Sequence, residues 1–362
     1  MKNKEYWFWL CNIHNIGLKK IQAILDLYET PERAFHESEK GLECLNILTD
    51  ADRLMIRKSK DSAKIQENYA KVLDKGIYFV TKEDSEYPDK LRNIYNPPHA
   101  LYVRGNLPKN QIGSIAVIGA RNCSEYGREV SKYIASELAK AGLQVISGLA
   151  RGIDGYAHQG ALAVEGSTYG VLGCGIDICY PVENFLLYMD MQKEGGVISE
   201  YGIGVNPNAG NFPMRNRIIS GMSDGILVIE AKEKSGSLIT VDLGLEQGKN
   251  IYALPGRIND RLSTGCNNLI KMGAKLVTEP KDILEDFFLN YEKFEMDTKK
   301  NDKLLETHEK MVYDSLSFYP KHMNEIAGET NFCIYELSEI LLSLELKNYI
   351  KQVRKNYYVC IP

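Results

Sequence analysis

Short apolar runs alternate with longer amphipathic stretches through the middle of the chain, from residue 112 to about residue 289. Residues 115–118 are wholly apolar and end at Gly119, as expected of a strand that is buried on both faces of a parallel sheet. Residues 126–141 then place apolar side chains at helical spacing, and Gly142 ends the predicted helix. The pattern recurs and predicts further strands at residues 143–146, 168–172, 196–199, 225–229, 250–254 and 274–277. This alternation predicts an α/β fold built on a doubly wound parallel sheet.

Residues 5–75, ahead of this alternation, repeat apolar positions at helical spacing. The segment Ile13-His14-Asn15-Ile16-Gly17-Leu18-Lys19-Lys20-Ile21 resembles a helix-hairpin-helix, in which main-chain N–H groups beside a glycine turn hold a DNA backbone. Only Lys19 and Lys20 supply positive charge there, which favours the alternative of a small helical bundle used for packing or partner contact. Residues 76–81 and 100–105 are predicted strands that extend the sheet or join it to this helical region.

The chain after the sheet region consists of a polar stretch followed by a set of short predicted helices and strands. Residues 290–303 are polar and charged without an apolar period, which predicts a linker. Three short helices are then predicted at residues 309–318, 323–327 and 334–346, and a hairpin of two strands at residues 349–353 and 357–361. This order is typical of a winged helix. The predicted domains are a helical domain similar to SAM or helix-hairpin-helix domains, a sheet domain, a linker and a winged-helix domain, at residues 1–75, 76–289, 290–303 and 304–362.

Composition narrows the class of protein. The 362 residues carry a net charge of −4 and are 44% hydrophobic, enough for one large domain with smaller ones at its ends. Mild acidity excludes a generally basic nucleic-acid-binding protein but leaves room for a local basic pocket. The eight cysteines show no close zinc spacing and no disulfide pattern, and no apolar run is long enough for a signal peptide or a membrane span. These features predict a cytoplasmic protein with reduced thiols, no metal site and no membrane association.

Two loops of the first strand–helix–strand unit combine glycine with arginine. Gly119 precedes Arg121, and Gly148 and Gly152 flank Arg151. Glycine lets a backbone approach a ligand, helix N-termini present N–H groups to anions, and arginine binds phosphate through two N–H groups. Both loops are expected at the carboxyl edge of the sheet, where such folds bind ligands. The alternative is that the glycines only make tight turns and the arginines are surface residues.

Three further loops at predicted strand ends carry binding chemistry. Phe212-Pro213-Met214-Arg215-Asn216-Arg217 supplies arginines for phosphates and an aromatic ring for a base. Ser235-Gly236-Ser237 offers hydroxyls and main-chain N–H groups at a predicted helix start, an arrangement that binds anions. Gly265-Cys266-Asn267 is another glycine-led helix start. Five such loops on one edge predict a phosphate-binding site, for a nucleotide or for a nucleic acid.

Asp154 and His158 raise the question of catalysis. They are four residues apart on one helix face, so they could act as an acid–base pair. The favoured alternative is that Asp154 caps the helix and His158 packs in the core. Glu200 and Glu230 end predicted strands and are expected to accept hydrogen bonds from loop N–H groups or arginines. No dinucleotide fingerprint and no Walker A motif follows the first strand.

Together these residues resemble the DNA-processing protein A family, also called DprA or Smf. The resemblance covers the whole sheet region and extends to Tyr87-Pro88 before it. The matching stretches are Gly119-Ala120-Arg121, Tyr126-Gly127, Ser147-Gly148-Leu149-Ala150-Arg151-Gly152-Ile153-Asp154, Ala157-His158, Tyr180-Pro181, Ser199-Glu200, Phe212-Pro213-Met214-Arg215-Asn216-Arg217, Ser235-Gly236-Ser237 and Pro255-Gly256. One departure is Ala120, where the family usually has a serine, so one hydroxyl contact to phosphate is missing while the charge of Arg121 stays.

The resemblance implies an extended Rossmann fold with a helical N-terminal domain and a C-terminal winged helix. It also implies a recombination mediator that binds and protects single-stranded DNA, loads the RecA recombinase onto it during natural transformation, and forms a homodimer through the sheet domain. No enzymatic activity and no cofactor are expected. With the loop chemistry above, the residues expected to contact DNA are Gly119, Arg121, Gly148, Arg151, Gly152, Phe212, Arg215, Asn216, Arg217, Ser235, Gly236, Ser237 and Asn267.

The rival class is an enzyme or a nucleotide sensor with the same fold. Related sheet domains include phosphoribohydrolases that cleave nucleoside monophosphates, in which a glycine-rich loop ends in a catalytic glutamate. The comparable loop here is residues 235–240, and Thr240 stands where that glutamate is expected. Threonine cannot serve as the general acid or base in that role, so the sequence favours a binding protein.

The third predicted helix of the winged helix is acidic. Residues 332–346 include Glu336, Glu339 and Glu345 and no lysine or arginine. Glu336 and Glu339 share a face, and a polyanion against them would cost Coulomb energy and release no counterions. The basic residues gather around the hairpin instead, at Lys347, Lys351, Arg354 and Lys355. We therefore expect this domain to contact a protein partner, or to touch a DNA backbone weakly through the hairpin, without docking its third helix in duplex DNA.

Overall fold

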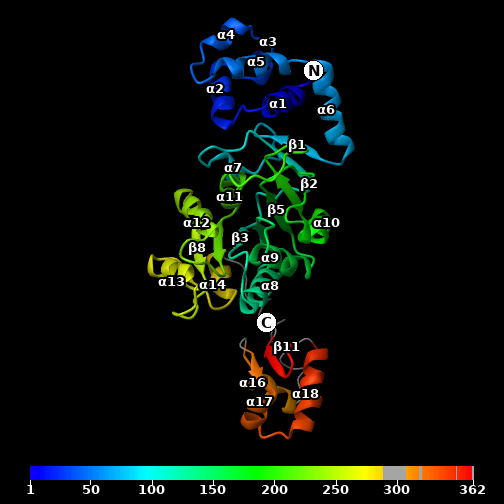
Figure 1. The fold of residues 1–362 in the computed structure, drawn as a ribbon, viewed down its shortest axis with the longest axis vertical. Helices are drawn as coiled ribbons and strands as arrows, with labels where there is room; N and C mark the ends of the chain where they lie inside the picture. Colours follow the sequence, from blue (N-terminus) through cyan, green and yellow to red (C-terminus); the bar gives the residue numbers. More distant parts are fainter. Residues whose placement is uncertain (288–306, 318–319, 348, 361–362) are drawn as a thin grey trace.

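Figure 1 shows a computed structural model of the chain, in which three parts follow one another along the longest axis. The N-terminal helices occupy one end, the sheet the middle, and the C-terminal helices and hairpin the other end. The structure describes residues 1–287, 307–317, 320–347 and 349–360. The predicted linker, residues 290–303, lies outside the described residues, and the domain boundaries drawn from the sequence stay predictions.

A nine-stranded sheet forms the centre of the described part of the chain, in the order β1-β2-β6-β5-β4-β3-β7-β8-β9. The strands from β6 to β9 in this order run parallel, whereas β2 is antiparallel to β6 and β1 is antiparallel to β2. The predicted doubly wound parallel sheet is confirmed, with β1 and β2 as an added edge. The strands are β1 (Tyr78–Thr81), β2 (Ala100–Gly105), β3 (Ser114–Ile118), β4 (Gln144–Ser147), β5 (Thr168–Leu172), β6 (Gly196–Ser199), β7 (Gly225–Val228), β8 (Asn250–Ala253) and β9 (Lys275–Leu276).

Helices of the sheet region begin and end where the local sequence directs. They are α7 (Asp89–Arg92), α8 (Glu125–Lys140), α9 (Ile153–Leu162), α10 (Phe185–Glu194), α11 (Asn211–Met222), α12 (Gly236–Glu246), α13 (Thr264–Lys271) and α14 (Lys281–Leu284). Ser124 accepts a hydrogen bond from the Gly127 N–H at the start of α8, and Gly142 follows its end with a φ of +91°. The predicted helix cap at Asp154 is wrong. Gly152 is the N-cap of α9, and the Asp154 carboxylate reaches back across the tight loop to accept the Gly148 N–H.

Strand β3 explains why helices cover both faces of the sheet. Its five residues are all buried, and alternate side chains point to opposite faces. Ile115 and Val117 join a core that includes residues of α8 and α9, whereas Ala116 and Ile118 join a core that includes residues of α11 and α12. Burying each large apolar side chain favours folding by about 1.5 to 3 kcal/mol, so the strand is held from both sides.

The N-terminal helices share their apolar core with the sheet. Trp7 and Phe8 of α1 pack in one cluster with Phe79 of β1 and Tyr102 of β2. Gly17 is the N-cap of α2, in the turn that the sequence predicts between two short helices. The helices before the sheet are α1 (Asn3–Cys11), α2 (Leu18–Tyr28), α3 (Pro31–His36), α4 (Glu39–Glu43), α5 (Asp50–Ser59) and α6 (Ser62–Asp74). No helix in the described ranges is long and apolar enough to cross a membrane.

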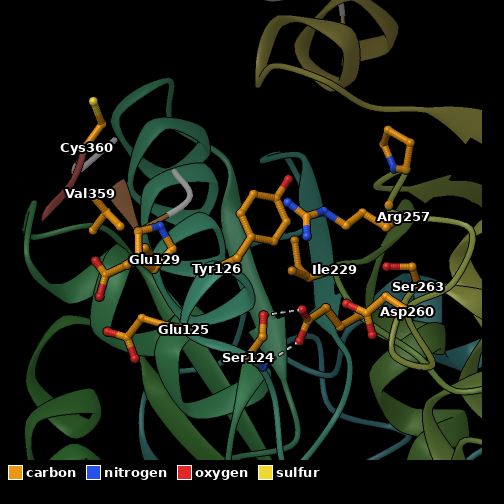
Figure 2. A pocket seen from close by; sticks show the side chains of 14 residues that line it. Ser124, Glu125, Tyr126, Glu129, Ile229, Arg257, Asp260, Ser263, Val359 and Cys360 are labelled. Carbon is orange, nitrogen blue, oxygen red and sulfur yellow. Dashed lines mark hydrogen bonds between the residues drawn. The ribbon is translucent and has the colours of Figure 1, made fainter. Parts of the chain in front are cut away.

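The C-terminal elements confirm the predicted winged helix. They are α16 (Thr307–Ser315), β10 (Lys321–His322), α17 (Met323–Thr330), α18 (Ile334–Leu346), β11 (Ile350–Arg354) and β12 (Tyr357–Cys360), with β10 pairing beside β12. Lys351 on β11 lies 3.5 Å from Glu125 and 3.6 Å from Glu129, both on α8. A cavity of about 240 Å³ lies beside this contact (Figure 2). The start of α8 lines it together with Val359 and Cys360, and Arg257, Asp260 and Ser263 line its other side.

Candidate nucleic-acid interface

A cavity of about 860 Å³ opens at the carboxyl ends of β3 and β7. These neighbouring strands mark the point where the strand order reverses, because β3 leads to β4 on one side while β7 leads to β8 on the other. Doubly wound folds bind their ligands at such a switch point. The topology thus places the cavity where a ligand is expected.

Most of the residues that the sequence singles out converge on this cavity. It is lined by Gly119, Arg121, Phe212, Arg215, Asn216, Ser235, Gly236 and Ser237. Two lysines that sequence reasoning missed, Lys232 and Lys234, line it as well. The sequence could have indicated them by position alone, because they lie in the loop after the buried strand β7, at the same edge of the sheet as the other loops.

The charges around the cavity favour an anion. Arg121, Lys232 and Lys234 are exposed cations, and Arg215 adds a fourth cation that is buried in the wall. Among the described residues that line the cavity, one is acidic, and it is Asp154. Four cations against one carboxylate give a local positive potential within a protein of net charge −4, and the walls of a cleft concentrate that potential.

Arg215 is the most constrained of these cations, with only 4% of its surface exposed. Its Nη1 donates a hydrogen bond to the carbonyl of Val171 at the end of β5. Burial lowers the pKa of Arg215 to about 10, and the nearby Asp154 opposes that shift, so the guanidinium stays charged at neutral pH. Gly148 makes room for it, because a Cβ at that position would overlap the guanidinium. Gly148 therefore shapes the site without lining the cavity.

An aromatic wall lies beside the cations. The rings of Tyr180 and Phe212 are 5.7 Å apart, and the Arg121 guanidinium lies 5.5 Å from the centre of the Phe212 ring. Gly173 permits this placement, because a Cβ there would lie 2.8 Å from Phe212 Cδ1. Aromatic faces next to phosphate-binding cations suit a base and its backbone together.

The start of α12 supplies neutral hydrogen-bonding groups to the same cavity. Ser235 is the N-cap, and its Oγ lies 2.8 Å from Ser237 Oγ. Nothing lies within 4 Å of the position that a Gly236 Cβ would take, so a ligand can approach the main chain there. Across the cavity, Asn216 Nδ2 lies 3.5 Å from the Gly236 carbonyl. The helix start thus adds N–H donors to an anion site.

Four predicted site residues lie away from the cavity. Arg217 is 4% exposed and forms an ion pair with Glu200, and Arg151 pairs on the surface with Glu183. Asn267 hydrogen-bonds both the N–H and the carbonyl of Gly256. Gly152 has a φ of +76° and packs against the main chain of the Gly119 loop. The structure gives each of them a positioning contact.

The N-terminus of α8, where many nucleotide-binding folds accept a phosphate, already holds a carboxylate. Glu230 accepts hydrogen bonds from the N–H and the Oγ of Ser124 (Figure 2). A Cβ at Gly127 would overlap that carboxylate, so a larger residue there would displace Glu230 from the start of α8. The structural roles predicted for Glu230 and Glu200 are confirmed. The negative charge of Glu230 also directs anions to the cationic side of the edge.

Asp154 and His158 are not placed as an acid–base pair. His158 is fully buried, and its Nδ1 lies 2.7 Å from Thr168 Oγ1. Burial lowers the pKa of His158 to about 3, whereas burial raises the pKa of Asp154 and the Arg215 charge opposes that rise. The alternative of a packed histidine is confirmed, and Asp154 serves the Gly148 loop and Arg215.

Fold and cavity together define a doubly wound α/β protein with a cationic, aromatic-walled cavity at the switch point of its sheet. Residues 78–288 match the family model described as DNA recombination-mediator protein A, and residues 297–354 match the DprA winged helix domain. The first match spans more than half of the chain, so this chain belongs to the DNA recombination-mediator protein A family, DprA.

Similar proteins come from several bacteria. DNA processing protein DprA of Bacillus subtilis is 38% identical over 224 residues, which cover 62% of this chain and 75% of that protein. The Streptococcus pneumoniae protein is 44% identical over 204 residues, 56% of this chain and 72% of its own length. The X-ray structure of S. pneumoniae DprA matches with a TM-score of 0.70 at 33% identity, covering 80% of this chain and 99% of that one. A Helicobacter pylori DprA structure, concerned with the single-stranded-DNA binding mode of that protein, matches with a TM-score of 0.52 at 29% identity, covering 58% and 95%.

Acid should destabilise the fold through its buried histidine. His158 stays neutral in the folded chain down to about pH 3, whereas an unfolded histidine takes up a proton near pH 6.5. The unfolded state then binds more protons below pH 6.5, so the free energy of unfolding falls as pH falls, by about 1 kcal/mol between pH 7.5 and 5.5 for this group. Urea unfolding at both pH values should show a smaller fall for His158→Gln than for the wild type. An equal fall in both would contradict the assignment.

Proposed function

We propose that this chain binds single-stranded DNA in the cavity at the β3–β7 switch point. The observation that supports this most directly is the meeting of Arg121, Arg215, Lys232 and Lys234 with the Phe212 ring. The cations suit phosphates, and the half-buried Phe212 ring at the cavity wall suits an unpaired base, which a duplex would keep stacked inside. The related H. pylori protein is described by its single-stranded-DNA binding mode, which supports the same ligand here.

The proposal extends to the role of a recombination mediator. Family membership supports a chain that protects incoming single strands and loads RecA onto them during natural transformation. We further propose a homodimer formed through the sheet domain and a cytoplasmic location. Arg151 and Arg217 belong to this proposal as residues that position the Gly148 loop and α11, with Asn267 and Gly152 holding neighbouring loops.

We also propose that the chain is a binding protein without enzymatic activity. Thr240, which stands where related hydrolases are expected to place a catalytic glutamate, is 2% exposed at the cavity wall. A threonine hydroxyl does not ionise near neutral pH, so it cannot supply the general acid or base for cleaving a glycosidic bond. The Glu230 carboxylate at the start of α8 further disfavours a nucleotide phosphate at that position.

Replacing Arg121 should weaken strand binding without changing sequence preference. Arg121→Ala removes one exposed cation from the cavity, so affinity for a 20-nucleotide oligo(dT) should fall by about tenfold and the salt slope should flatten by about 0.7. Fluorescence anisotropy at two salt concentrations measures both. Lys64→Ala, at an exposed lysine on α6, is the matched control. Wild-type affinity in Arg121→Ala would rule out the cavity as the DNA site.

Purified protein should release no free base from nucleoside monophosphates and should leave DNA uncut. The physical reason is the threonine at the glutamate position. Chromatography of a nucleotide incubated with the wild-type chain should show only substrate. Release of a base at a rate proportional to protein concentration would establish the hydrolase alternative instead.

Removing the winged helix should change single-strand affinity little. Glu336 and Glu339 are exposed on α18, and two of the basic residues near the hairpin are already paired, Lys347 with Glu309 and Lys351 with Glu125 and Glu129. A chain ending before Asp302 should therefore bind oligo(dT) within about a factor of three of the full chain, about 0.6 kcal/mol. Circular dichroism checks that the sheet is still folded. A loss of tenfold or more in the folded truncation would contradict this expectation.

A further inference from the structure

Helix α18 of the winged helix buries one face and leaves the opposite face in solvent. Three leucines that point into the winged-helix core are fully buried: Leu337, Leu341 and Leu344. On the other face, Tyr335, Leu342 and Leu346 each keep more than half of their surface exposed. The helix lies along one side of the C-terminal part of the molecule (Figure 1), and no described part of the chain covers these three side chains. Large apolar side chains gathered on one exposed face mark a site of interaction.

The exposed side chains form one straight stripe, which we call the α18 stripe. It consists of Tyr335, Glu339, Leu342 and Leu346. At 100° per residue these four positions fall within an arc of about 60°, and the stripe is about 16 Å long. Steps of four, three and four residues are the spacing of a coiled-coil seam, in which one helix packs along another. The α18 stripe thus has the geometry to receive a second helix.

The α18 stripe carries negative charge that the described chain does not neutralise. Glu339 is exposed within the stripe, and Glu336 and Glu345 border it on its two sides. Their carboxylates accept the N–H groups of Cys333 and Gln352, which hold them in place beside the stripe. Among the described residues, no lysine, arginine or histidine forms an ion pair with any of these three glutamates. A helix that packs here therefore meets three carboxylates.

These charges exclude a second copy of α18 as the occupant. In a parallel pair of α18 helices, Glu339 would face its own copy. In an antiparallel pair centred on the stripe, Glu336 would approach Glu345 of the other helix. Like charges beside such a seam destabilise the wrong pair and select for a different partner. A polyanion is excluded for the same reason, so the carboxylates require an occupant that is cationic.

We propose that the α18 stripe binds a basic amphipathic helix of a partner protein. The apolar side of that helix packs on Tyr335, Leu342 and Leu346, and its lysine or arginine side chains lie against the three glutamates. The contact needs a partner helix of about three turns, because the stripe is about 16 Å long. This role is separate from the cavity at the switch point and does not depend on DNA binding.

Two synthetic helical peptides of three heptads test the proposal on the full-length protein. Both carry the same leucine seam, and the positions beside the seam are lysines in one peptide and glutamates in the other. Fluorescence anisotropy should show that the lysine peptide binds and the glutamate peptide does not. Leu342→Ala and Glu339→Lys should each weaken binding of the lysine peptide by about tenfold or more. Glu339→Lys should also improve binding of the glutamate peptide, which a merely unfolded domain would not do.

Glu325→Lys on α17 is the matched control, because Glu325 is an exposed glutamate of the same domain outside the stripe. It should leave affinity for the lysine peptide within about a factor of two. An equal loss in Glu325→Lys and Glu339→Lys would show attraction to overall negative charge and would overturn the proposal. So would equal binding of the two peptides, or binding of neither. Sedimentation velocity that shows self-association lost in Leu342→Ala would assign the stripe to a second copy instead.

Discussion

The burial of one positive charge, that of Arg215, constrains the whole carboxyl edge of the sheet. Taking a guanidinium out of water is costly, and here the Val171 carbonyl accepts one of its hydrogen bonds while the charge of Asp154 offsets part of the cost of burial. The Nε of Arg215 has no partner among the described residues. A Cβ at Gly148 would overlap the guanidinium where it now lies, and the Asp154 carboxylate folds back onto the Gly148 loop. The charge of Arg215 then acts on the cavity through protein and not through water. Electrostatic attraction is stronger across protein, because its dielectric constant is lower.

The carboxyl edge of the sheet disfavours an anion at the start of α8 and favours one at the start of α12. At the start of α8, the Glu230 carboxylate takes the Ser124 N–H and hydroxyl, so the helix end is already neutralised. At the start of α12, the cap is the neutral hydroxyl of Ser235, which accepts the Ser237 N–H, so no carboxylate stands at this helix end beside Arg121 and the two lysines. A single buried carboxylate therefore decides which side of the switch point can hold a phosphate. This explains how a protein without a dinucleotide motif keeps the fold and changes the ligand.

Strand and helix positions could be predicted from the sequence because buried parallel strands are continuous apolar runs between glycines. Strand β5 begins and ends as predicted, and so does β6. The site was harder to predict than the strands, because a sequence motif does not show which way each side chain points. Arg215 and Arg217 are about 200° apart around α11, so one faces the cavity and the other meets Glu200 inside. Lys232 and Lys234 have no motif at all, and only the strand order brings them to Arg121.

The net charge of the chain does not show which of its surfaces can bind an anion, because many of its charges pair with one another within the protein. Two of the four basic residues around the hairpin of the winged helix form ion pairs within the chain: Lys347 pairs with Glu309, and Lys351 lies close to Glu125 and Glu129 of α8. On α18, Tyr335, Leu342 and Leu346 are 74%, 58% and 76% exposed, and with Glu339 they fall on one face of the helix. An apolar and acidic face matches the chemistry of a protein surface better than that of a polyanion. Around the switch point, by contrast, Arg121, Arg215, Lys232 and Lys234 line one cavity, and the order of the strands in the sheet sets their spacing.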